Sequence, residues 1–100
     1  MSDFDVTRNM RIIDALKSDI LSDLAALYKD MAGFGRKADF EDRFAGIVTA
    51  AYLLAARLGI SFERLDDKAV SLLRLKLLEN PEANADASRL LTFLNGRNET

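Results

Sequence analysis

The chain lacks cysteine, histidine and tryptophan among its 100 residues. Without cysteine, it can form neither disulfides nor thiolate metal sites. Without histidine, it lacks the commonest general base and the usual zinc ligand. Any metal bound here would therefore be a hard ion held by oxygen atoms, such as Mg²⁺ or Mn²⁺.

Proline is also scarce, with one residue, and runs of alternating Val, Ile and Thr are missing, while 49% of the residues are hydrophobic. This composition predicts an all-α protein. One hundred residues form one domain, near the size at which burial in a core becomes marginal. We therefore expect a bundle of about four helices that is completed by oligomerisation.

The net charge and the first residues of the chain argue against several classes of partner and destination. The net charge of −2, with basic residues dispersed along the chain, gives no reason to expect nucleic acid as a partner. The first residues, MSDFDVTRNM, resemble neither a signal peptide nor a transit peptide. No apolar run reaches the ~20 residues that span a bilayer. We expect a cytoplasmic protein with no membrane partner.

Hydrophobic spacing predicts two long helices in the first half of the chain. After an N-terminal arm over residues 1–8, the first helix runs from about Thr7 to Met31 and ends at Gly33-Phe34-Gly35. Asp39 is the expected N-cap of the second helix, which runs to about Leu58.

Local signals also delimit the second half. Gly59 suits the end of one helix and Ser61 the start of the next, which spans Phe62 to about Glu79. Within it, Asp66-Asp67 is a candidate break. Asn80-Pro81 stops this helix.

A short last helix is expected from about Asp86 to Leu94. Asn95-Gly96 closes it. We expect the tail from Arg97 to Thr100 to be frayed.

The second helix contains FAGIVTAAYLLAA, residues 44–56, which is apolar almost all the way round. A helix with no polar face must be covered on every side. With few other helices available in the chain, this segment favours burial between helices of more than one subunit. A homo-oligomer is therefore expected.

Acids on the first helix are the first candidates for chemistry. Asp19, Asp23 and Asp30 lie within about 40° of one another on a helical wheel. Such a group can hold a divalent cation and, through it, phosphate oxygens. The alternative, which these residues alone favour, is a solvated flank whose acids pair with Lys or Arg.

Basic residues near the start of the second helix are candidates for phosphate binding: Arg36, Lys37 and Arg43. Their alternative role is to complement the acids of the first helix. No nucleophile is paired with a base, and no phosphate-binding Gly-rich loop is present. Catalytic residues therefore stay unknown.

The element order and the segment LLAARLGISFERLDDKA resemble the MazG-like family of the all-α nucleoside triphosphate pyrophosphohydrolase superfamily. The similarity covers roughly Asn9 to Leu78 and is closest at Ala55 to Lys68. It is nearest to the short, single-domain branch. It implies a MazG-like helical domain over 9–80, followed by a short helix and tail over 81–100.

The resemblance implies that active members bind Mg²⁺ through E-E-x-x-E on one helix and E-x-x-D on the next, and cleave NTPs to NMP and pyrophosphate. Here the first motif falls on Asp19 to Asp23, which retain its outer acids, and the second on Arg43 to Gly46, which retain none. Arg43 is expected to pair with Asp19 or Asp23. Glu41 and Asp42 would serve as metal ligands only in another register.

These departures lead us to expect a degenerate, non-catalytic MazG-like domain. It would form a helical homo-oligomer and bind a nucleotide or a protein partner, with no cofactor expected. One alternative is an active pyrophosphohydrolase that uses Mg²⁺ or Mn²⁺ held by Asp19, Asp23 and Glu41 or Asp42. Another is a purely structural assembly module.

Overall fold

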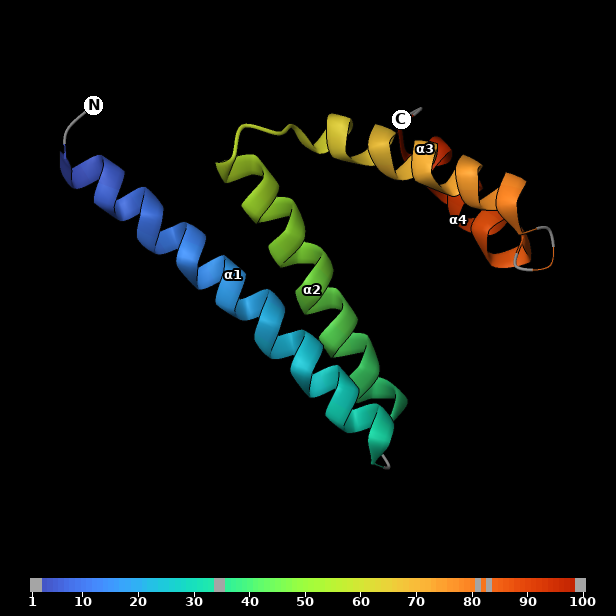
Figure 1. Cartoon of the computed structure of the whole chain (residues 1–100), viewed down its shortest axis with the longest axis horizontal. Coiled ribbons are helices and arrows are strands. Elements are labelled where there is room, and N and C mark those ends of the chain that lie inside the picture. Colours follow the sequence, from blue (N-terminus) through green and yellow to red (C-terminus); the bar gives the residue numbers. More distant parts are fainter. Residues whose placement is uncertain (1–2, 34–35, 81, 83, 99–100) are drawn as a thin grey trace. The chain divides into compact units, whose positions relative to one another are not determined.

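The protein, seen here as a computed structural model, is built from four α-helices (Figure 1). The structure describes residues 3–33, 36–80, 82 and 84–98, and contains no strand within them. The helices are α1 (Asp3–Ala32), α2 (Lys37–Arg57), α3 (Phe62–Glu79) and α4 (Asn84–Asn98). The all-α class with four helices is confirmed.

The helices pair into two compact units, residues 1–59 and 60–100. In the first, α1 and α2 run in opposite directions and pack along their length (Figure 1). In the second, α3 packs against α4. The residues of the domain expected over 9–80 fall in α1, α2 and α3, and its bounds stay a prediction. None of the four helices, over the described residues, has the length and hydropathy that a membrane span requires.

Helix α1 begins at Asp3, four residues before the expected start at Thr7. Asp5 in the first turn favours this earlier start, because negative charge stabilises the positive end of the helix dipole. Most of the expected N-terminal arm is therefore helical. At the other end α1 stops at Ala32, and Gly33 lies in a turn, while Phe34 and Gly35 fall outside the described residues.

The start of α2 corrects the role of Asp39. The N-cap is Arg36, and Asp39 is the third helical residue. Its Oδ2 accepts a hydrogen bond from the Arg36 backbone N–H at 3.4 Å. The carboxylate therefore caps the helix from inside its first turn, in the manner of the acidic partner in a capping box.

The corner between α2 and α3 follows its local sequence as predicted. Gly59 has φ of 85°, in the left-handed region that glycine adopts without a steric penalty. Ser61 is the N-cap of α3, and its hydroxyl oxygen accepts the Arg64 backbone N–H at 3.1 Å. Asn80 ends α3, as expected.

Both helices of the second unit are more continuous than predicted. The structure shows α3 unbroken at Asp66-Asp67 and α4 running through Asn95-Gly96 to Asn98. The core of this unit packs apolar residues from both helices: Val70, Leu73 and Leu94, with Ala69, Ala87 and Leu91 around them. Both supposed breaks therefore lie beside packed turns, and packing overrides the local signals.

Burial within the first unit is thin. Leu27 of α1 and Ala50 and Ala55 of α2 are its buried apolar residues within the described chain. Several large apolar side chains of the same two helices stay more than half exposed, including Leu21, Phe44 and Leu53. The apolar α2 segment therefore still lacks the cover that its sequence calls for.

Candidate functional site

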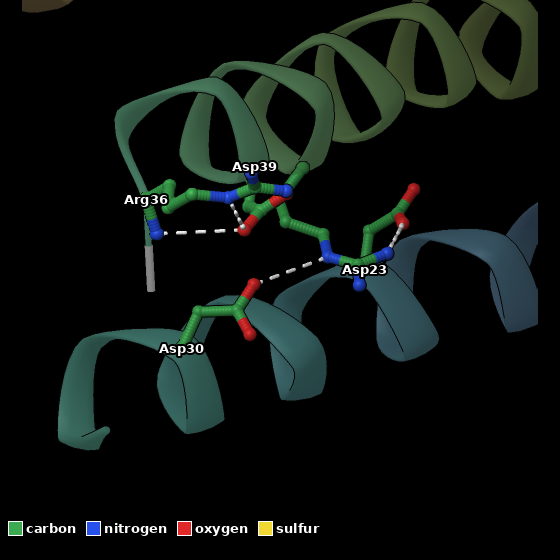
Figure 2. A network of polar contacts seen from close by, with 5 residues as sticks. Asp23, Asp30, Arg36 and Asp39 are labelled. Carbon is green, nitrogen blue, oxygen red and sulfur yellow. Dashed lines mark hydrogen bonds and ion pairs between the residues drawn. The ribbon is translucent and has the colours of Figure 1, made fainter. Parts of the chain in front are cut away.

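At the α1–α2 contact, the guanidinium of one arginine lies between two carboxylates. Arg43 of α2 donates from Nε to Oδ2 of Asp30 over 3.4 Å. Its Nη1 lies 3.8 Å from Oδ1 of Asp23. Figure 2 shows Asp23 and Asp30 two turns apart on α1, both reaching toward α2. Each carboxylate side chain is 25% exposed, so these charges meet in a partly desolvated setting.

Helical spacing explains why these groups meet. Residues seven apart on α1, and residues three apart on α2, share a face. Gly46 accordingly lies with Arg43 on the face of α2 that meets Asp23. A Cβ at position 46 would collide with Oδ2 of Asp23 and lie 2.9 Å from its Cγ. The missing side chain of Gly46 is therefore what makes room for the Asp23 carboxylate.

The other expected phosphate-binding residues lie at the start of α2. Arg36 Nε is 3.7 Å from Oδ2 of Asp39, in a solvent-exposed pair (Figure 2). The side chain of Lys37 falls outside the described residues. Arg43 thus complements acids of α1, as in the alternative interpretation, whereas Arg36 pairs with an acid of its own helix.

The remaining predicted metal ligands do not join this cluster. Asp19, Glu41 and Asp42 are all exposed. Within the described part of the chain, no three side chains of the His, Cys, Asp and Glu types form a group able to hold a metal ion. The expected pairing of Arg43 with Asp23 is confirmed, and its second partner is Asp30 rather than Asp19. Asp30 shares a face of α1 with Asp23, but so does Asp19, so helical spacing alone did not decide between them.

Comparison with models of known protein families identifies the family. The model of the MazG-like family matches residues 6–90. The chain belongs to the MazG-like family. The match exceeds the resemblance seen in the sequence at both ends, since it takes in the early turns of α1 and the start of α4. Searches of curated proteins and of solved structures found no match.

In this MazG-like chain, a further ion pair between helices was missed by the sequence reasoning. Arg97 of α4 donates to Asp66 of α3 through Nε (3.0 Å) and Nη2 (2.8 Å). Asp66 is buried, and the Arg97 guanidinium lies 5.5 Å from the centroid of the Phe93 ring. Asp66 precedes Val70 and Leu73 by four and seven residues, so its place on the buried face could be predicted from the sequence. Its partner Arg97 could not, because Arg97 lies in the tail that was expected to be frayed.

Proposed function

We propose that this chain is a non-catalytic MazG-like domain that assembles into a helical homo-oligomer and acts by binding a nucleotide or a protein partner. One observation supports the proposed loss of catalysis. The Arg43 guanidinium, at a position where the resemblance implies a metal-binding acid, lies between Asp23 and Asp30.

Charge and ligand number both support this proposal. A guanidinium stays protonated at any ordinary pH, so it repels a divalent cation approaching the same carboxylates. Position 46 supplies no side-chain oxygen, and the Asp23 carboxylate lies in the space that a side chain there would fill. Mg²⁺ is held by carboxylate and other oxygen ligands in near-octahedral geometry. The two carboxylates of this contact do not fit a divalent cation, because both already face the Arg43 guanidinium.

Exposed apolar surface supports the oligomer. Phe44 and Leu53 of α2, and Leu21 of α1, are all more than half exposed. Soluble proteins rarely leave contiguous apolar patches larger than a few hundred Å² uncovered unless they form an interaction site. Assembly with other copies supplies that cover.

The catalytic part is tested by measuring pyrophosphate release from a panel of NTPs and dNTPs with Mg²⁺ or Mn²⁺. We expect release at the level of the protein-free blank, because the Arg43 guanidinium already pairs with Asp23 and Asp30. Asp23→Ala is the matched control. Turnover by the wild type that Asp23→Ala abolishes would show an active pyrophosphohydrolase instead.

Ligand binding is read separately from catalysis, by thermal unfolding with and without each nucleotide. Binding to the native state raises its stability, so a nucleotide ligand raises the unfolding midpoint. An unchanged midpoint for every nucleotide would favour a protein partner or a purely structural role. Light scattering on a sizing column tests assembly, and a folded monomer at micromolar concentration would contradict the homo-oligomer.

A further inference from the structure

The outward side of α3 carries a row of exposed leucines, here called the leucine ridge. It consists of Leu72, Leu75 and Leu78, whose exposed fractions lie between 52% and 80%. At 100° per residue, Leu75 is rotated by about 180° from Asp66, which lies on the buried face and contacts α4. Residues three apart form one of the ridges by which a helix packs into the groove of another helix. Within the described residues of the second unit, no helix covers this ridge.

Basic residues form a second row, which crosses the leucine ridge at Leu72. This basic row consists of Arg64, Lys68 and Lys76, which share a side of α3 with Leu72 because successive members are four residues apart. All three cations are exposed. Among the residues that the structure describes, none of the three has an ion pair. Their charges are therefore available to the acids of another molecule.

A hollow lies beside the basic row, where α3 ends. Its volume is about 250 Å³, and it is lined by Lys76, Glu79, Asn80 and Ala87. Sites that enclose a small molecule typically measure about 300–1,000 Å³, so this hollow is smaller than a nucleotide would need. Its size suits a single side chain, and the side chains that anchor protein interfaces commonly fill such pockets. The hollow therefore favours a protein partner at this side of α3.

The charges around the ridge favour a narrow partner over a flat one. Asp67 and Glu79 lie to either side of Leu75 and are exposed. A negatively charged lipid surface would meet both acids together with Arg64 and Lys68, so the charges on this side would cancel. A helix contacts only a strip along the ridge, and it can place acids beside the basic row alone.

We propose that the outward side of α3 binds an acidic amphipathic helix of a partner protein. The apolar stripe of that helix covers the leucine ridge, and its acidic side chains pair with the basic row. Burial of the leucines supplies affinity, while the cations select the partner by charge. This inference rests on the proposed function and names the kind of protein partner that the proposed function leaves open.

The first experiment measures the binding of two synthetic peptides to the full chain by fluorescence anisotropy. Both are helices of about three heptads with leucine at positions a and d, and they carry either glutamate or lysine at positions e and g. Like charges at e and g keep each peptide from pairing with itself. At low salt, the glutamate peptide should bind at least about tenfold more tightly than the lysine peptide, and added salt should reduce this difference. Equal binding, or no binding of the glutamate peptide, overturns the inference.

The second experiment compares Leu75→Glu with Leu53→Glu, because each of these leucines is 52% exposed and Leu53 lies on α2. Leu75→Glu should weaken binding of the glutamate peptide at least about tenfold, and Leu53→Glu less than about threefold. Combining Lys68→Glu with Lys76→Glu should reverse the preference, so that the lysine peptide binds more tightly. This reversal is a gain of binding, which a loss of folding cannot produce. Equal effects of the two leucine variants, or an unreversed preference, contradict the proposal.

Two further measurements identify other occupants of this side. Sedimentation of the wild type with vesicles of equal parts phosphatidylglycerol and phosphatidylcholine, abolished by Leu75→Glu, would assign it to a lipid surface and reject the partner helix. Self-association weakened by Leu75→Glu would assign it to a second copy and also reject the partner helix. An inactive oligomer that binds neither peptide keeps the proposed function and rejects this inference. Pyrophosphate release that Asp23→Ala abolishes overturns the proposed function itself.

Discussion

At the scale of single residues, the Asp23 carboxylate meets two residues of α2, Arg43 and Gly46. Arg43 supplies a positive charge 3.8 Å away, and Gly46 supplies space. Each stands at a position where the resemblance implies an acid, and the structure shows an internal ion pair between Arg43 and Asp23 there. The two replacements are therefore coupled through a single side chain.

This coupling predicts that Gly46→Ala changes the free energy of unfolding by different amounts with and without the Asp23 carboxylate. Alanine favours a helix interior over glycine by about 1 kcal/mol. In an Asp23→Ala background, we expect Gly46→Ala to stabilise the protein by about this amount. In the wild type, displacement of the carboxylate should offset at least ~0.5 kcal/mol of the gain. Urea unfolding of the four proteins in the double-mutant cycle measures the difference.

Gly96 of α4 provides the control for this cycle. A Cβ there would meet nothing within 4 Å. Gly96→Ala should therefore stabilise both backgrounds equally, by about 1 kcal/mol. Equal effects of Gly46→Ala in the two backgrounds would show that Asp23 does not occupy the space beside Gly46.

At the scale of helices, starts and stops set by neighbouring residues were predictable, and those set by distant ones were not. Gly59 and Ser61 act through their own backbone and the next turn, so the α2–α3 corner was read correctly. The last turn of α4 depends on Asp66, which is 31 residues away from Arg97. Nothing local to Asn95-Gly96 reveals that contact, and the local signals there predicted a stop.

The Asp66–Arg97 pair is expected to hold the end of α4 on α3. Arg97→Met keeps much of the aliphatic length but leaves a buried carboxylate without this charged partner. Because breaking a buried pair costs up to 3–5 kcal/mol, and Arg97 is partly exposed, we expect a loss of about 2 kcal/mol of unfolding free energy. Chemical denaturation measures it.

Arg89 of the same helix is the matched control for Arg97. It pairs with Asp86 at 3.6 Å, with both side chains exposed to solvent. Because exposed pairs contribute little, Arg89→Met should change stability by less than about 0.5 kcal/mol. Similar losses for the two variants would assign the effect to general charge on α4 rather than to the bidentate contact.

The candidate site was predictable in composition and only partly in geometry. Aligning positions 43 and 46 with the acidic motif of the second helix placed an arginine and a glycine opposite Asp23, and the structure brings these residues together. Choosing Asp30 over Asp19 as the second carboxylate required the relative height of the two helices. That height depends on the packing of both helices, which sequence spacing does not contain.

At the scale of the whole molecule, the chain consists of two helical hairpins with small cores. Two helices alone bury little apolar surface, and most helical stability comes from tertiary packing. The thin burial in the first hairpin and its exposed apolar side chains thus have the same cause, which is that two helices alone bury too little apolar surface. The homo-oligomer proposed above would relieve this shortage.

Stability is therefore expected to depend on protein concentration. Association that accompanies folding makes the thermal midpoint rise with the concentration of the chain. Raising it from about 2 µM to about 200 µM should increase the midpoint by several degrees, as scanning calorimetry or circular dichroism would record. Leu21→Glu should abolish this dependence. A wild-type midpoint that is constant over this range would indicate a self-sufficient monomer.

Because of the arginine between Asp23 and Asp30, these two carboxylates need no ion from the solvent to neutralise them. Carboxylates gathered without a resident cation repel one another and depend on the solvent to neutralise them. Here the neutralising charge is covalently part of α2, so no chelator can remove it. We therefore expect the first hairpin to keep its α1–α2 contact at any concentration of divalent ions. This includes concentrations at which a metal-dependent assembly would come apart.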